Sequence, residues 1–395
     1  MKLTHDLSVD FCGKRFINPF SIAASPPSDR RERIERAFQA GWAGAVFKTT
    51  SVEGEPVHLA YPIMSACSGK GLNAYGNIDL ISERHIDEIC SDIRYLKEAY
   101  PDRILIGSIM ARNRGEWELL VNDLEEAGVD MIECSMSCPQ GDGSGVIPVT
   151  DPGMTKEVTG WIRDARRKDT PIIVKLTPMV ANLTEIAMAA KEGGADAVCA
   201  IDSVHGYCGI DLDTMLPKLS VGGKSTYCGI SGPAVKPVAL ACVSELARTV
   251  GLPVAGVGGI STWEDAAEFL LLGAGTLQLC TAVMRNGFGI IANLLAGLDG
   301  YMQEKGFERV SDMVGKCLGT FEDHEKLDRA SKRIAVRDPE RCTGCGKCYT
   351  ACRNNGYGAI RMEGKQPVID PEKCRGCGFC TLACPSEGCL TIREQ

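Results

Sequence analysis

The sequence lacks several features that would place it in common functional classes. It has no uninterrupted apolar run of about 18 residues, so no segment is long enough to cross a bilayer as a helix. Its first residues, Met1 to Asp6, lack the apolar core of a signal peptide, and we expect a cytoplasmic protein. With 43 Lys and Arg against 51 Asp and Glu, the net charge of −8 argues against a nucleic-acid partner, because binding phosphates requires a basic surface.

A further absence concerns nicotinamide cofactors. An open, doubly wound sheet that binds a dinucleotide carries a glycine-rich fingerprint at its first strand-to-helix turn, and none is found there. The nearest match is Gly256-Val257-Gly258-Gly259, but Ser261 stands where the third glycine would be. We therefore expect NAD(P)H to bind another polypeptide, an FAD-containing reductase subunit.

Cysteine, by contrast, is abundant, with 20 among 395 residues. Eleven are scattered through the first 317 residues, as is typical of small, reduced, buried side chains. Nine lie in the last 54 residues, and eight of these form two runs with one spacing: Cys342-x2-Cys345-x2-Cys348-x3-Cys352 and Cys374-x2-Cys377-x2-Cys380-x3-Cys384. This spacing is typical of bacterial ferredoxins with two four-iron–four-sulfur clusters.

In such ferredoxins the fourth cysteine of each run binds the cluster of the other run. The predicted ligands of the first cluster are therefore Cys342, Cys345, Cys348 and Cys384. Those of the second are Cys374, Cys377, Cys380 and Cys352. Paired zinc sites are the alternative, but zinc ribbons use two C-x2-C pairs rather than triplets with a more distant fourth cysteine. Cys389 lies outside both runs, and we interpret it as a packing residue.

The rest of the chain alternates short apolar runs with amphipathic stretches such as Arg30–Gln39 and Glu116–Ala127. The runs are nearly continuous in apolar residues, as in strands buried on both faces. There are eight: Phe20–Ser25, Gly44–Thr50, Ile104–Ile109, Met131–Ser137, Pro171–Thr177, Ala197–Asp202, Pro253–Gly259 and Thr276–Ala282. They predict an α/β fold, a (β/α)8 TIM barrel over residues 1–317, with an open doubly wound sheet as the alternative. A polar connector, 318–333, and a small ferredoxin-like α+β module, 334–395, would follow.

Polar residues and glycines collect where the predicted strands end, which in a barrel is the catalytic rim. They are Lys48, Thr49, Asn113, Ser135, Ser137, Cys138, Lys175, Asp202, Ser203, Gly258, Gly259, Cys280 and Thr281. Two long predicted loops, 51–81 and 203–232, also follow strand ends, and long loops in compact domains are often functional.

Three of these positions suggest flavin chemistry. A buried Lys175 needs a negative partner, which the N1–C2=O edge of a reduced flavin would provide; a salt-bridged core lysine is the alternative. Gly258-Gly259 suits backbone donation to a phosphate, as at the usual phosphate site of barrels. The Cys138 thiol can act as a general acid or base on the open face of the flavin, although a structural thiol is the alternative. A flavin would also connect single-electron clusters to two-electron chemistry.

Motifs along nearly the whole chain also resemble one known family. They include Asn18-Pro19-Phe20, Lys48-Thr49, Ser137-Cys138-Pro139, Val174-Lys175-Leu176-Thr177-Pro178, Ser231-Gly232-Pro233-Ala234, Gly258-Gly259-Ile260, Leu277-Gln278-Leu279-Cys280 and the two cysteine runs. In order and spacing they resemble dihydropyrimidine dehydrogenase of the dihydroorotate dehydrogenase-like superfamily, especially its bacterial subunit with FMN and two clusters.

The resemblance implies a role for each matching residue. The residues expected to contact FMN are Lys48, Thr49, Lys175, Gly232, Gly258, Gly259, Cys280 and Thr281. The substrate would face Asn113, Ser135, Ser137, Asp202 and Ser203. In this family, hydride passes between flavin N5 and one carbon of a C=C bond conjugated to an amide. Cys138 would protonate the neighbouring carbon. We expect a small-molecule substrate and an oligomeric protein.

Two departures from the family put the substrate in question. Ser135 and Asp202 stand where the family has asparagines that pair with the amide edges of a pyrimidine. An ionised aspartate only accepts hydrogen bonds, and a site built for one hydrogen-bond pattern rejects another strongly. Alternatives are therefore a different unsaturated substrate and oxidation of a dihydroorotate-like acid, which Asp202 disfavours. A non-catalytic electron-transfer subunit is also possible, but it would not need Cys138.

Overall fold

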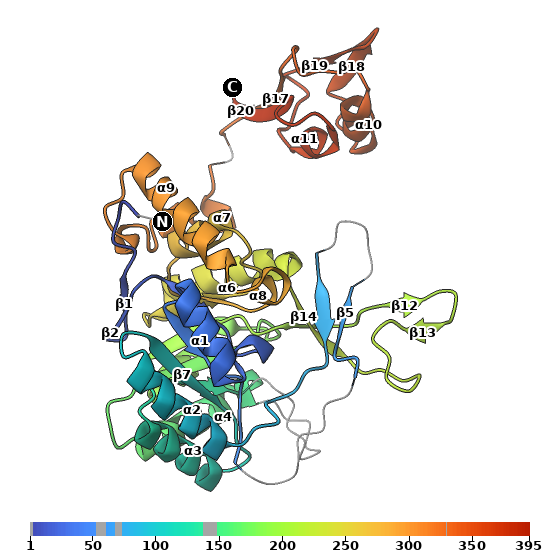
Figure 1. Cartoon of the computed structure of the whole chain (residues 1–395). Helices are drawn as coiled ribbons and strands as arrows, with labels where there is room; N and C mark the ends of the chain where they lie inside the picture. The colour runs from blue at the N-terminus through green and yellow to red at the C-terminus, as the bar shows by residue number, and fades with distance from the viewer. Residues whose placement is uncertain (1–2, 53–60, 68–72, 137–147, 329) are drawn as a thin grey trace. The chain divides into compact units, whose positions relative to one another are not determined.

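The computed structural model describes residues 3–52, 61–67, 73–136, 148–328 and 330–395 (Figure 1). Ser137 and Cys138, two of the predicted site residues, lie outside these ranges. The chain divides into two compact units, Met1–Thr320 and Phe321–Gln395, and the division falls within the predicted connector.

The first unit is a closed barrel of eight parallel strands. Around the barrel these are β3 (Phe20–Ile22), β4 (Gly44–Val46), β7 (Ile104–Ile109), β8 (Met131–Ser135), β9 (Ile172–Leu176), β10 (Ala197–Ala200), β15 (Val254–Val257) and β16 (Ala274–Leu279). Each lies within or overlaps one of the eight predicted runs, so the predicted TIM barrel is confirmed. The runs are continuous in apolar residues because helices cover the strands from outside while the barrel interior buries their other face.

Helices follow the strands and surround the barrel (Figure 1). They are α1 (Arg31–Ala40), α2 (Ile86–Ala99), α3 (Arg114–Ala127), α4 (Pro152–Ala165), α5 (Leu183–Gly193), α6 (Lys236–Thr249), α7 (Trp263–Leu271), α8 (Thr281–Asn286) and α9 (Ile290–Lys305). Polar side chains cap several N-termini: Asn113 caps α3, Asn182 caps α5 and Thr262 caps α7. The predicted run Thr276–Ala282 was too long, because α8 already begins at Thr281.

The two long predicted loops meet in a second sheet of four antiparallel strands. The segment 51–81 provides β5 (Met64–Ala66) and β6 (Tyr75–Asn77), and the segment 203–232 provides β11 (Val204–Gly206) and β14 (Cys228–Ser231). The strand order is β11-β14-β6-β5, so β14 and β6 join the two segments. A short hairpin, β12 (Ile210–Asp211) and β13 (Leu216–Pro217), extends from the second segment (Figure 1). At the other end of the chain's first unit, a hairpin of β1 (Val9–Phe11) and β2 (Lys14–Phe16) packs Phe11 beside Gly275, at the start of β16.

The second unit is a small α+β module. Its first and last strands, β17 (Arg333–Arg337) and β20 (Leu390–Glu394), pair with each other, and β18 (Ile360–Glu363) pairs with β19 (Gln366–Ile369). Helices α10 (Lys347–Asn354) and α11 (Phe379–Ala383) begin within the two cysteine runs. Among the described residues of both units, no helix combines the length and apolar character that a membrane span requires.

Candidate functional site

One lysine at the barrel rim forms an ion pair with a carboxylate of the segment 51–81. Lys48 follows β4, is almost fully buried, and its Nζ lies 2.9 Å from Oδ1 of Asp79. Asp79 comes just after β6. Next to Lys48, the hydroxyl of Thr49 lies 2.8 Å from the Ser108 hydroxyl of β7. Both lysine and threonine are therefore held in place by side chains from neighbouring elements.

A second lysine belongs to a buried polar network inside the barrel. Lys175 on β9 lies 3.3 Å from Oε1 of Glu133 on β8, and Glu133 is completely buried. Gln278 on β16 donates to the other carboxylate oxygen of Glu133 at 2.8 Å. Burial alone would lower the pKa of Lys175, but the negative charges of Glu133 and Asp202 outweigh burial and raise its pKa. The raised pKa favours the charged form of Lys175, and the salt bridge considered as an alternative is present.

Glycines form a close-packed backbone corner beside the second sheet. Gly258 and Gly259 follow β15 with φ of +126° and +81°, a region that favours glycine. A Cβ on Gly259 would lie 2.8 Å from the backbone nitrogen of Lys236 and 3.0 Å from the carbonyl oxygen of Gly232. No described residue accepts a hydrogen bond from the amide of Gly258 or Gly259. This corner thus offers backbone donors and has room for little besides backbone.

Cys280 and Thr281 connect this corner to the start of α8. The Thr281 hydroxyl donates to Ser231 Oγ at 3.0 Å, immediately before Gly232. Cys280 stands at the N-cap of α8. Burial raises the pKa of Cys280, and a hydrogen bond with Ser25 and the charge of Lys175 oppose that rise.

The predicted substrate residues lie at different places in the structure. Ser135 ends β8, is buried, and pairs in register with Lys175. Asp202 follows β10 and accepts the backbone N–H of Ser203 at 2.8 Å. Asn113 is exposed, and its side chain accepts the Glu116 N–H as the N-cap of α3. Ser137 and Cys138 lie outside the described residues, so their roles, like those of the others, stay predictions.

Sequence reasoning missed the partners of the two lysines. It assigned no role to Asp79, Glu133 or Gln278, although a glutamate inside the apolar strand β8 was a signal that a buried cation must lie nearby. His205, near Asp202 in sequence, is exposed on β11 and packs against the ring of Tyr227 with 5.0 Å between ring centroids.

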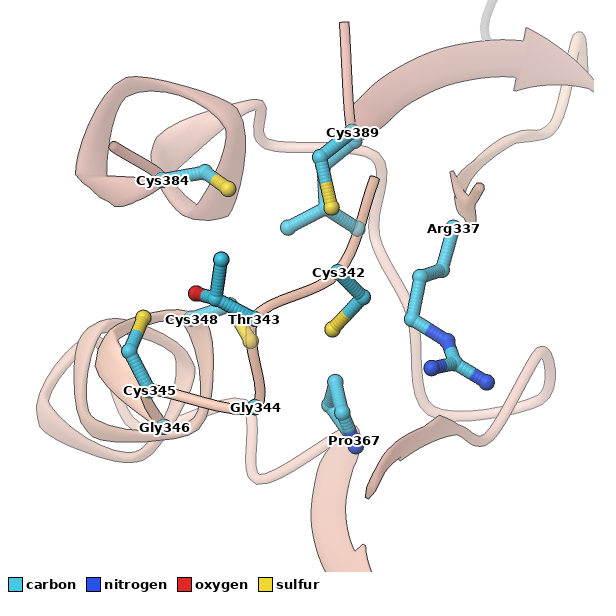
Figure 2. A pocket seen from close by; sticks show the side chains of 11 residues that line it. Arg337, Cys342, Thr343, Gly344, Cys345, Gly346, Cys348, Pro367, Cys384 and Cys389 are labelled. Carbon is cyan, nitrogen blue, oxygen red and sulfur yellow. The ribbon is translucent and has the colours of Figure 1, made fainter. Parts of the chain in front are cut away.

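Two cysteine-lined pockets occupy the second unit. Figure 2 shows the first, which has three cysteines of the first run and one of the second on its wall: Cys342, Cys345, Cys348 and Cys384. Arg337 and Cys389 also line it, so Cys389, interpreted above as packing, is both buried and part of this wall.

The second pocket has the reciprocal composition, with Cys374, Cys377, Cys380 and Cys352 on its wall. Backbone N–H groups point at two of its sulfurs: Ala359 donates to Cys352 at 3.2 Å and Ala335 to Cys374 at 3.4 Å. Such donors stabilise thiolates and tune cluster potentials. Every described cysteine in this unit is free of disulfides. Each pocket wall thus combines three thiols of one run with one thiol of the other.

Comparison with known proteins accounts for both units. Residues 6–302 match the family described as dihydroorotate dehydrogenase, and residues 335–392 match the 4Fe-4S dicluster domain. The chain belongs to the dihydroorotate dehydrogenase family. It is 39% identical over 374 residues to the NAD-dependent dihydropyrimidine dehydrogenase subunit PreA of Escherichia coli (strain K12). The aligned region covers 92% of this chain and 89% of PreA.

Two other relatives differ in extent. The chloroplastic dihydropyrimidine dehydrogenase (NADP(+)) of Arabidopsis thaliana is 35% identical, covering 83% of this chain and 80% of its own length. The catalytic subunit of dihydroorotate dehydrogenase B (NAD(+)) of Pyrococcus abyssi is 34% identical, covering 79% of this chain and 99% of its own length. The chain is thus an oxidoreductase acting on CH–CH bonds, like a dihydropyrimidine dehydrogenase subunit, and its family and dicluster domain imply flavin and iron–sulfur cofactors.

Proposed function

We propose that the barrel binds FMN, that the second unit binds two four-iron–four-sulfur clusters, and that the protein interconverts an activated C=C bond and its dihydro form. The observations that support the proposal are the buried, ion-paired Lys48 and Lys175 and the Gly258-Gly259 corner, all at strand ends of one barrel, in a chain that also has two four-cysteine pockets.

The residues at the rim fit FMN in charge and shape. Lys175 provides a fixed cation toward the negative edge of the reduced ring, and Lys48 provides a second. The Gly258-Gly259 amides, together with Gly232 and Thr281, suit the phosphate, which backbone donors without side chains can approach closely. When bound, FMN supplies hydride transfer between its N5 position and one carbon of the substrate.

The chain's own acid–base group would be Cys138. Its thiol is proposed to give a proton to the carbon next to the one that receives hydride, and to take that proton back in the oxidation direction. Ser135 and Asp202 would contact the polar edge of the substrate, with Ser203, Ser137 and Asn113 around it. Since Asp202 can only accept hydrogen bonds when ionised, it selects a substrate with a donor at that edge.

The eight cysteines of the two runs would hold the clusters in the crossed pattern, because each pocket wall combines three cysteines of one run with one of the other. When bound, the clusters carry single electrons. Related proteins are named as subunits, which supports a partner. We propose an FAD-containing reductase subunit that binds NAD(P)H, in a cytoplasmic, oligomeric complex.

A pyrimidine is the first substrate to test, because two of the relatives are named dihydropyrimidine dehydrogenases. The altered residues Ser135 and Asp202 favour a second candidate, an unsaturated cyclic compound with a different hydrogen-bond pattern. Oxidation of a dihydroorotate-like acid is disfavoured by the carboxylate of Asp202, which would repel the acid.

The deciding experiment mixes the purified protein with uracil or thymine under anaerobic conditions after its flavin has been reduced. Fast reoxidation of the flavin, followed by its absorbance, is expected if the site takes pyrimidines. With FMN and iron both present and no reoxidation by either base, pyrimidine reduction is excluded and the second candidate is screened with other unsaturated cyclic amides. If no flavin co-purifies with or binds to the protein, the proposal itself is wrong.

A further inference from the structure

Three cysteines outside the candidate site gather in the sheet that joins the two loop segments. The sulfur of Cys208 lies 3.9 Å from the sulfur of Cys67 and 3.9 Å from that of Cys228. Cys67 belongs to the segment 51–81, whereas Cys208 and Cys228 belong to the segment 203–232. Cys208 and Cys228 are buried, and Cys67 is partly exposed.

The sheet is shaped to hold these sulfurs. A Cβ added to Gly76 on β6 would lie 2.1 Å from the Cys208 sulfur and 2.8 Å from the Cys228 sulfur. The bare backbone of Gly76 therefore makes the space that two of the thiols occupy. Leu219 and Ile230 complete a small apolar cluster around them. The cluster is separate from the core of the barrel.

The resting state of Cys67 and Cys228 is the thiol. Burial raises the pKa of Cys67 to about 11 and that of Cys228 to about 12, so little thiolate exists near neutral pH and reaction is slow. None of the three forms a disulfide in the structure. A disulfide needs its sulfurs about 2.05 Å apart, and side-chain rotation can close much of the remaining gap.

We propose that Cys67, Cys208 and Cys228 form a redox-active thiol site, in which Cys208 forms a disulfide with either neighbour on reaction with a hydroperoxide. Cys67, the most exposed, attacks the peroxide and becomes a sulfenic acid as one water leaves. The Cys208 thiol then displaces the second water as the S–S bond forms. Two thiols lose two electrons and two protons, and hydrogen peroxide becomes two waters. A second exchange, in which Cys228 attacks Cys208, moves the bond and frees the Cys67 thiol.

This thiol site is separate in function from the flavin and cluster chemistry proposed above. A Cys67–Cys208 bond links the two loop segments covalently, whereas a Cys208–Cys228 bond stays within one segment. Because Cys208 is shared, the two bonds exclude each other. The central position of Cys208 is the feature that an experiment can test.

The test uses the full-length, cofactor-loaded protein, reduced and then treated with a small excess of hydrogen peroxide. Remaining thiols are alkylated, and tryptic peptides are analysed by mass spectrometry. Lys218 and Lys224 lie between Cys208 and Cys228, so trypsin separates their peptides. We expect Cys67–Cys208 and Cys208–Cys228 cross-links. Cys208→Ser should lose both, and so should Cys67→Ser, because Cys67 is the thiol that reacts with peroxide. Cys228→Ser should lose only the Cys208–Cys228 cross-link.

Cys242→Ser is the matched control, since Cys242 on α6 is another partly exposed thiol of the same unit. It should keep both cross-links. Iron and flavin contents of each variant check that it folds. Complete alkylation of Cys67, Cys208 and Cys228 after peroxide treatment overturns the proposal. A Cys67–Cys228 cross-link that forms equally well without Cys208 overturns the central role.

Discussion

The two units assemble their proposed cofactor sites in different ways. Each pocket of the second unit takes three cysteines from one short run and only the fourth from the other run. The barrel site instead combines residues from position 48 to position 281, carried by different strands and loops. Local spacing therefore encodes most of the first kind of site, while barrel closure assembles the second. Variants that remove a local or a distant contribution can sharpen or break this comparison.

The largest effect should come from removing one cluster ligand, whether that ligand comes from the local run or from the distant one. Cys342→Ala and Cys384→Ala should each remove one cluster, about four of eight irons, because both contribute to the same pocket. The double variant should lose no more iron, whereas Cys342→Ala/Cys352→Ala should lose both clusters. Iron and sulfide analysis after anaerobic reconstitution gives the counts. An iron-free Cys342→Ala/Cys384→Ala protein would mean that each run holds its own cluster.

In the barrel, the largest effect on rate should come from Cys138→Ser. Loss of a positioned acid should lower turnover by about 10² to 10⁴-fold. Flavin and iron contents should not change. Stopped-flow measurement of flavin reoxidation by substrate reports the rate. Wild-type turnover in the variant would remove the acid–base role and favour a pure electron-transfer subunit.

A large effect on protein stability is expected from breaking the buried ion pair between Lys175 and Glu133, which barrel closure brings together. Lys175→Met leaves the Glu133 charge buried without its cation and should destabilise the protein by about 3–5 kcal/mol. Lys175→Met/Glu133→Gln should recover most of that loss but not the affinity for FMN. Urea unfolding of the flavin-free protein and flavin titration separate the two effects.

A matched control exists for this pair. Lys97 lies 2.8 Å from Asp130 but is more exposed than Lys175. Lys97→Met should therefore cost less, about 1 kcal/mol, because solvent screens the charge that remains. Equal losses for both lysine variants would show that burial does not set the strength of the pair.

The strands and the cluster ligands could be predicted from the sequence because their signals are local. Strands buried on both faces appear as apolar runs, and the cysteine spacing needs no tertiary information. The Glu133–Lys175–Gln278 network could not be predicted, because it depends on which strands become neighbours and in which register. The pairing of the two long loops was hidden for the same reason. Only the length of the two loops could be read from the sequence. Their pairing, through β14 and β6, joins residues more than a hundred positions apart.

A smaller effect is expected at the glycine corner. Gly259→Ala should lose both stability and FMN affinity, because its φ of +81° strains alanine and its Cβ would meet Lys236. Gly287 has a similar φ of +76°, but nothing lies within 4 Å of an added Cβ. Gly287→Ala should therefore show only the backbone strain, about 1–2 kcal/mol. Thermal unfolding and flavin titration of the two variants measure the difference, and identical behaviour would contradict close packing at position 259.

The smallest expected effect distinguishes two roles of Asn113, a helix cap and a contact to the substrate. Asn113 and Asn182 each accept the N–H of a glutamate three residues later at 3.1 Å. Replacing either with alanine should cost about 1 kcal/mol. If Asn113 also contacts the substrate, only Asn113→Ala should raise KM. A KM unchanged in both variants would leave Asn113 as a helix cap alone.

The shared antiparallel sheet has a consequence for anyone who wishes to retarget this enzyme by exchanging loops. Strand β14 pairs on one side with β11 of its own segment and on the other with β6 of the distant one. A donor loop grafted into positions 51–81 alone would have to supply a strand that pairs with β14. A donor loop grafted into 203–232 alone would have to supply a strand that pairs with β6. The two insertions therefore form one transplantable unit, and chimeras should exchange them together.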